Sequence, residues 1–177
     1  HVDGKWKREL IAKIRAEVPG VALRTTMIVG FPGEGRKEFA ELLRFVEETR
    51  FERLGAFKYS EEEGTFGAEN FNDSVTSRTK QSRLDRLMEL QGAISLEFNK
   101  SRIGSELKVI VDDFSDGIFV CRSEYDSPEV DGEILVRHDP GMMGDADPYS
   151  LIGAFIKVRV TAAAEYDLTA DFVDYEE

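Results

Sequence analysis

Residues 24–34 of the chain read RTTMIVGFPGE, and this stretch decides how the first half of the protein folds. The run from Val21 to Val29 is rich in β-branched and apolar side chains, which is typical of a largely buried strand. Two glycines and a proline within residues 30–33 then end the strand in a turn. We therefore expect a buried strand that leaves its sheet at Gly30.

The segments on either side complete a strand–helix–strand unit. Apolar residues recur at helical spacing in residues 36–49, and Leu54–Tyr59 (LGAFKY) is typical of a second strand. Elements of these lengths predict a parallel pair with a right-handed crossover. Upstream, apolar residues at every fourth position between Trp6 and Val18 predict an amphipathic helix that Asp3 caps and a Pro-Gly pair ends.

The second half of the chain has a different pattern. Residues 60–74 predict a loop and residues 77–103 a long helix, after which short runs of alternating polarity predict strands. These runs are residues 106–112, 117–122, 132–137, 154–162 and 165–173, with a Gly/Pro/Asp loop at 138–151. Five short strands are typical of a small antiparallel barrel of the OB type. The predicted fold class is thus α/β plus all-β, with residues 1–75 as part of a parallel barrel, 76–103 as a connecting helix and 104–177 as the small barrel.

Charge separates the same two halves. Residues 1–100 carry 17 Lys and Arg against 17 Asp and Glu, whereas residues 101–177 carry six against 18 and hold the whole net charge of −12. A domain this acidic repels a phosphate backbone and attracts basic surfaces. An acidic surface that only aids solubility explains the same numbers.

Composition excludes several classes of protein. No apolar run approaches the roughly 20 residues of a membrane helix, and the N-terminus lacks the apolar core of a secretory signal. A single cysteine, Cys121, forms no internal disulfide, so we expect a cytoplasmic protein. One cysteine and two histidines cannot assemble a zinc or iron–sulfur ligand set, and no nucleophile–base pair or phosphate loop is present. We therefore predict no catalytic and no metal-binding residue in this chain.

Two strand ends remain as candidate binding positions. Gly30 ends the first strand, where the lack of a side chain lets a flat ligand lie against the backbone, although an ordinary turn needs the same glycines. The second strand ends at Tyr59 and runs into Ser60 and three glutamates, Glu61–Glu63, which suit either ligand contacts or a solvated loop. Because carboxyl ends of parallel strands share one edge, both candidates belong to the same rim.

Three motifs together resemble one enzyme family. RTTMIVGFPGE (24–34) and FKYSEEEGT (57–65), in this order and spacing, look like the methylthiotransferase branch of the radical-SAM enzymes. YDSPEVDG (125–132) resembles the TRAM domain of those members that modify an aspartate of the small-subunit ribosomal protein uS12. The resemblance covers all but the first twenty residues. It implies a parent enzyme that uses S-adenosylmethionine and two 4Fe-4S clusters to add a methylthio group to the β-carbon of that aspartate.

The resemblance also implies which residues of this chain face the cofactor. Ile28, Val29 and Gly30 would lie near the adenine, Phe57, Lys58 and Tyr59 would offer main-chain contacts to it, and Arg24, Thr25 and Thr26 would neighbour the methionyl or ribose part. The cluster-binding cysteines of the family are missing from this sequence. We therefore expect a truncated, inactive part of a longer enzyme that retains no cofactor, and whose uncovered sheet edges favour self-association.

Charge and resemblance together predict the partner. A strongly basic ribosomal protein, uS12, suits a domain of charge −12 better than RNA does, and neither a nucleic acid nor a membrane is expected as partner. The predicted docking residues are Asp112, Asp113, Asp116, Glu124, Asp126, Glu129, Asp131 and Glu133. Two alternatives stay open: part of a methylthiotransferase acting on adenosine in tRNA, and a non-catalytic acidic adaptor for a basic protein.

Overall fold

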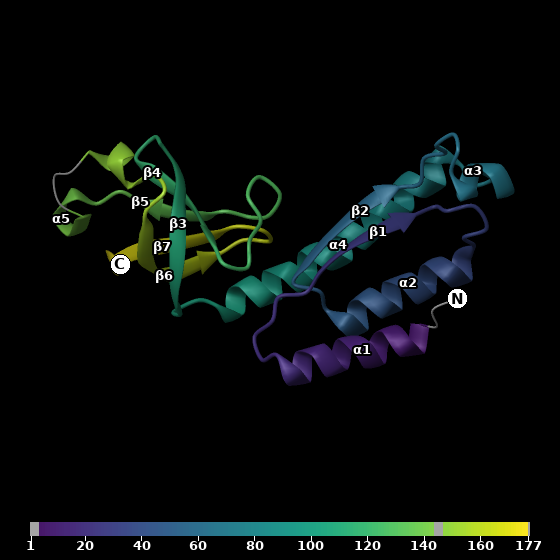
Figure 1. The fold of residues 1–177 in the computed structure, drawn as a ribbon, viewed down its shortest axis with the longest axis horizontal. Coiled ribbons are helices and arrows are strands. Elements are labelled where there is room, and N and C mark those ends of the chain that lie inside the picture. The colour runs from purple at the N-terminus through teal and green to yellow at the C-terminus, as the bar shows by residue number, and fades with distance from the viewer. Residues whose placement is uncertain (1–3, 144–146, 177) are drawn as a thin grey trace. The chain divides into compact units, whose positions relative to one another are not determined.

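A computed structural model describes residues 4–143 and 147–176, and Figure 1 shows how its elements follow one another. The chain forms two compact units that divide between Ile94 and Ser95, inside helix α4 (Ser77–Ser101). The predicted helix cap, Asp3, lies outside the described residues. Each unit has a hydrophobic core of its own, so each is described separately.

The first unit contains the expected parallel strand pair. Its elements are α1 (Gly4–Glu17), β1 (Arg24–Val29), α2 (Arg36–Thr49), β2 (Arg53–Lys58), the short α3 (Phe66–Asn70) and most of α4. Strands β1 and β2 pair in parallel, with Arg24 opposite Arg53 and Val29 opposite Lys58. Within the described residues, each strand pairs with the other alone, so both outer edges of this small sheet are open.

One face of the sheet is covered and the other is not. Side chains alternate along a strand, so Val29 and Leu54 point to the same side, where they pack with Phe39 and Val46 of α2 and Leu87 of α4. The opposite face is exposed. Parallel sheets are normally buried on both faces, so this bare face is an unusual feature that demands an explanation.

Helix α1 (Gly4–Glu17) makes several ion pairs with the rest of the first unit, and Ile11 packs against its core. None of its residues is buried, and Trp6 is more than half exposed, as is Val18 just after the helix. Arg15 instead binds the buried carboxylate of Glu52 at 2.6 Å, and Glu52 also accepts a hydrogen bond from the Leu23 amide. Arg8 binds Glu48 and Glu41 of α2, which places α1 beside α2 (Figure 1).

The second unit is a closed five-stranded barrel. Strands β3 (Glu106–Ser115), β4 (Ile118–Ser123), β5 (Ile134–Arg137), β6 (Phe155–Ala163) and β7 (Leu168–Tyr175) follow the order β3-β4-β5-β7-β6, and β6 closes onto β3. The predicted loop 138–151 contains two short helices, α5 (Pro140–Met143) and η1 (Pro148–Leu151).

The predicted OB-like barrel of five strands is confirmed, but one of its strand pairs is not antiparallel. Strands β5 and β7 are parallel, while every other neighbouring pair is antiparallel. The reason is geometric: strand direction cannot alternate all the way around a closed ring with an odd number of strands. A five-stranded barrel must therefore contain a parallel pair, and here the long connection after β5 makes it possible.

The barrel core contains the only cysteine. Phe119 is fully buried, and Cys121 on the same strand is 1% exposed among aliphatic side chains of all five strands. Burial, with a smaller contribution from the negative charge of Asp112, raises the pKa of the Cys121 thiol to about 12. The native barrel thus favours the neutral thiol.

This shift predicts how the barrel responds to alkali. The thiol of the unfolded chain ionises near pH 9 and that of the native barrel near 12, so stability is fully present below pH 9 and is lost as the pH rises from 9 to 12. The expected loss is about 1.4 kcal/mol per pH unit within that window. Urea unfolding between pH 8 and 11 measures it, with Cys121→Ser, which has no titrating thiol, as the control. Equal slopes in the two proteins would contradict the prediction.

Candidate functional site

The bare face of the sheet brings together four of the nine predicted cofactor residues. Arg24, Thr26 and Ile28 of β1 point to this face, and Phe57 of β2 lies next to Ile28 in register. Ile28 is 55% and Phe57 63% exposed, which is high for large apolar side chains in a parallel sheet. The face therefore offers an apolar pair beside a hydroxyl and a guanidinium.

Three other predicted residues point the opposite way. Val29 is fully buried against the helices, Thr25 lies on the same side of β1, and Lys58 reaches α4, where its ammonium donates a hydrogen bond to Gln81 at 2.8 Å. Side chains of these residues do not reach the bare face, so only their main chains can take part in binding there. Their role as cofactor contacts stays a prediction.

The remaining two, Gly30 and Tyr59, form the rim where both strands end. The Tyr59 amide donates to the Val29 carbonyl at 2.8 Å, and the Gly30 amide donates to the Glu34 carboxylate at 3.1 Å. Gly30 has a φ of 76°, a conformation that favours glycine. A Cβ at this position would stand 2.4 Å from Cγ of Lys80, so the space that the glycine leaves is filled by a side chain of α4.

Two buried cations of α4 hold this rim, and the sequence did not point to either. The Lys80 ammonium donates to the Tyr59 carbonyl at 3.0 Å and to the carboxylate of Asp73. One turn later, Arg83 binds the Glu34 carboxylate at 2.8 Å, and these two side chains are each only 11% exposed. Charged residues in the first turns of a long helix normally indicate a solvated face, so no local signal marks these two.

An aromatic cluster continues the rim. Phe31 packs edge-on against Tyr59 at 5.0 Å and against Phe71 at 5.8 Å between ring centroids, and Phe66 extends the cluster outward. The Tyr59 hydroxyl is buried and has no hydrogen-bond partner within the described residues. Ser60 and the three glutamates after it are exposed, as a solvated loop would be.

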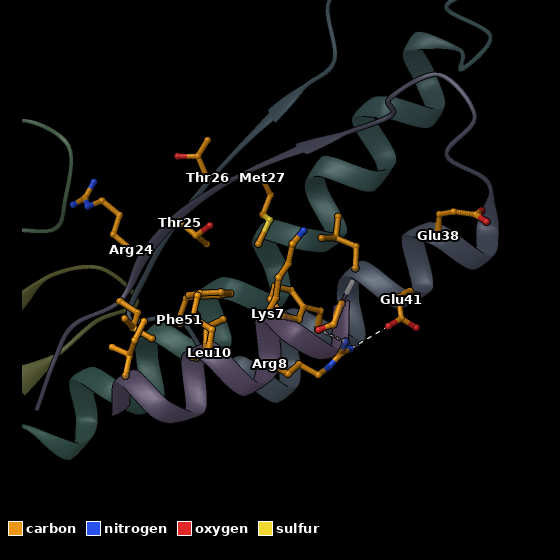
Figure 2. A pocket seen from close by; sticks show the side chains of 16 residues that line it. Lys7, Arg8, Leu10, Arg24, Thr25, Thr26, Met27, Glu38, Glu41 and Phe51 are labelled. Carbon is orange, nitrogen blue, oxygen red and sulfur yellow. Dashed lines mark hydrogen bonds and ion pairs between the residues drawn. The ribbon is translucent and has the colours of Figure 1, made fainter. Parts of the chain in front are cut away.

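A cavity of about 640 Å³ lies along the open edge of β1 (Figure 2). Four consecutive residues of the strand, 24–27, line it together with α1 and α2, and only the edge of a strand can present residues of both faces to one cavity. In Figure 2, Thr25 and Met27 point toward the helices, while Arg24 and Thr26 lie on the other side of the strand. The cavity therefore occupies the place where a neighbouring strand would pair with β1.

The eight predicted docking residues of the barrel have different roles. Asp126 accepts hydrogen bonds from Ser123, Asp131 accepts one from the Ser127 amide, and Asp112 pairs with Arg122 at 2.9 Å. The other five are exposed, and their carboxylates are without a partner in the part of the chain that the structure describes: Asp113, Asp116, Glu124, Glu129 and Glu133. Asp116 lies in the β3–β4 turn, whereas Glu124, Glu129 and Glu133 follow the opposite end of β4, so the eight do not form one continuous face.

The cations of the barrel are largely engaged within it. Lys108 and Lys157 share Glu176, Arg159 pairs with Glu106, and the Arg102 guanidinium lies over the rings of Phe98 and Tyr125. Arg137 alone among the barrel's Lys and Arg has no ion pair or hydrogen bond to the described residues. The barrel's carboxylates without a partner among the described residues therefore outnumber its cations without one.

Two absences hold within residues 4–143 and 147–176. No group of three or more His, Cys, Asp and Glu side chains is arranged to bind a metal ion. No helix there has both the length and the apolar character required to span a membrane.

Residues 103–173 match the family described as "TRAM domain", and this range covers nearly all of the closed barrel. The whole chain in turn is similar to proteins named "Ribosomal protein uS12 methylthiotransferase RimO". It is 47% identical to the one from Phocaeicola vulgatus and 44% to one from Bacteroides fragilis, over 98% of this chain in each case. One from Porphyromonas gingivalis is 48% identical over 94% of it.

These relatives confirm the resemblance to methylthiotransferases that the three motifs predicted. The chain spans about 38% of the length of the first relatives, since the matched regions make up 38%, 38% and 37% of those proteins.

Proposed function

We propose that this chain is the C-terminal part of a radical-SAM methylthiotransferase that modifies an aspartate of ribosomal protein uS12. The identity of 44–48% to several proteins named for this activity, along almost the whole chain, is the observation that carries the proposal. The first unit contributes part of the cofactor wall, and the acidic barrel docks the substrate protein. S-adenosylmethionine, bound at a 4Fe-4S cluster, supplies the radical chemistry in the longer protein.

The bare sheet face suits the cofactor in its chemistry. The exposed pair Ile28 and Phe57 offers an apolar surface for the flat adenine, and the Thr26 hydroxyl and Arg24 guanidinium offer polar groups for the ribose and the methionyl carboxylate. All four side chains project from one face of two adjacent strands. They would hold and orient the cofactor.

The exposed face of the β1–β2 sheet and the unpaired edge of β1 both fit a larger parallel barrel. In such barrels the strands enclose an interior that faces away from the surrounding helices, which corresponds to the bare face carrying Ile28 and Phe57. The cavity beside β1 has the position that the preceding strand of the barrel would take. We therefore assign the two strands of the first unit to the last strands of this larger parallel barrel. We expect the 177-residue chain alone to be inactive.

The acidic five-stranded barrel of the second unit is proposed to bind uS12 by charge complementarity. Five carboxylates are exposed without a partner among the described residues, and most of the domain's cations are engaged internally. Charge complementarity of this kind speeds association and selects a basic partner, and it weakens as salt increases. A phosphate backbone would be repelled by the same surface.

Binding of this chain to isolated uS12, and in parallel to bulk tRNA, at about 50 and 300 mM salt tests the docking role. We expect salt-sensitive binding to uS12 and none to tRNA. The combined change Glu124→Gln, Glu129→Gln and Glu133→Gln should weaken uS12 binding about tenfold at low salt, because each lost carboxylate costs roughly 0.5 kcal/mol.

The matched control removes three exposed carboxylates from the other unit: Glu61→Gln, Glu62→Gln and Glu63→Gln. It reduces the net negative charge by the same amount and should leave the affinity nearly unchanged. An equal loss in both triple variants would show that overall charge, and not the barrel, attracts the partner. Binding to tRNA alone would assign the chain to a tRNA-modifying enzyme instead.

A further inference from the structure

Lys80 is a buried lysine that contacts the ends of both strands. Only 8% of its side chain is exposed, although lysine is among the residues least often buried. A buried ammonium is unfavourable unless it is paired and hydrogen-bonded. Here its partners are the carboxylate of Asp73 and the main-chain carbonyl of Tyr59, and it lies 5.1 Å from the centre of the Tyr59 ring.

The aliphatic stem of Lys80 contacts the end of the other strand. Its Cγ would be 2.4 Å from a Cβ built on Gly30, so the stem occupies the position of the side chain that Gly30 lacks. The amide of Tyr59 donates to the carbonyl of Val29, directly before Gly30, and so joins the two ends. One side chain from α4 thereby contacts both β1 and β2 at the rim.

We propose that Lys80 is a positioning residue for the cofactor: it holds the main chain of Gly30 and Tyr59 in the arrangement that binds the adenine. This inference rests on the proposed function, because only that function places a cofactor at the rim. Lys80 does not touch the ligand. It acts by keeping two backbone segments ordered before binding, which lowers the entropic cost of binding.

The first test uses this chain and needs no cofactor. Lys80→Met keeps the length of the stem and removes the charge, and Lys100→Met, at an exposed position on the same helix, is the matched control. Amide hydrogen exchange measured by NMR should be at least about tenfold faster at Tyr59 and Gly30 in Lys80→Met and unchanged in the control. Equal rates in both variants would overturn the positioning role.

A milder variant covers the case in which Lys80→Met unfolds the first unit. Asp73 is partly exposed, and Asp73→Asn removes the charge partner while it leaves the stem of Lys80 against Gly30. Exchange at Tyr59 should then increase more than exchange at Gly30. An unchanged Tyr59 rate would contradict the proposal.

The second test measures binding of S-adenosylmethionine by calorimetry in the longer, cluster-containing protein. Lys80→Met should weaken this binding about tenfold and leave the affinity for uS12 within about twofold, because docking belongs to the other unit. Wild-type affinity for the cofactor in Lys80→Met would overturn the inference but not the proposed function. Failure of the wild-type protein to bind the cofactor would overturn the proposed function, and the inference with it.

Discussion

Gly132→Ala is expected to destabilise the barrel by about 3 kcal/mol or more, because main-chain atoms would collide and cannot move independently. A Cβ at residue 132 would stand 1.8 Å from the carbonyl oxygen of Tyr166 and 2.4 Å from its carbon. Neighbouring hydrogen bonds hold this approach: the Glu133 amide donates to Asp167, and the Leu168 amide donates to the Glu133 carbonyl. Relief of the collision would break the pairing of β5 with β7.

The measurement uses reporters specific to each unit. Trp6 is the single tryptophan and reports on the first unit, while labelling of buried Cys121 reports on the barrel. Gly132→Ala should lower the urea concentration at which Cys121 becomes exposed, and it should leave the unfolding transition seen by Trp6 fluorescence unchanged. Gly117→Ala is the control: its φ of 77° makes alanine strained, but a Cβ there meets no atom within 4 Å, so a cost of only about 1–2 kcal/mol is expected. Equal costs at the two glycines would show that the close approach is not decisive.

Arg83→Met is expected to lower the stability of the first unit by about 3 kcal/mol, because it leaves the Glu34 carboxylate buried without its cation. Arg83 donates both to that carboxylate, at 2.8 Å, and to the Glu34 carbonyl, at 2.9 Å. The pair ties the loop after Gly30 to α4, so the loss should also loosen the rim. Urea unfolding followed by Trp6 fluorescence measures the effect.

A second substitution distinguishes the loss of the ion pair from the cost of leaving the Glu34 carboxylate buried without a partner. Glu34→Gln combined with Arg83→Met should be more stable than Arg83→Met alone, because no unpaired charge then remains buried. Arg44→Met serves as the control in the same unit, since Arg44 and its partner Glu41 are both more than half exposed and such a pair contributes about 1 kcal/mol at most. A double variant that is less stable than Arg83→Met would mean that Arg83 acts through packing, for example against Phe39.

The candidate site shows where sequence reasoning succeeds and where it stops. The strand ends at Gly30 and Tyr59 were predicted to share a rim, and the parallel register places them there. The division of the nine residues between two faces was not predicted. Alternation along β1 separates Thr26 and Ile28 from Thr25 and Val29, but it does not say which set the helices cover. That depends on α2 and α4, whose apolar faces come from other parts of the chain.

In the acidic barrel, too, the sequence gives the number of charged residues but not their contacts. A count of residues shows that the second half is acidic, and no count shows which carboxylates are available. Asp126 and Asp131 are used to build the loop between β4 and β5, and Asp112 is paired, because each has a donor within reach in the folded domain. The remaining five are separated by the length of β4.

The sequence by itself determined the long helices and the strands, the uneven charge and the resemblance to methylthiotransferases, since helical and strand periodicity, glycine and proline turns and short motifs are properties of neighbouring residues. It missed the short helices α3, α5 and η1, which lie in segments that were predicted as loops. Only the tertiary structure decided which sheet face is bare, that β5 and β7 run parallel, and that Lys80 and Arg83 are buried against the rim. These features depend on contacts between residues far apart in the chain: the end of β1 and the start of α4 are about fifty residues apart, yet Arg83 and Glu34 meet there.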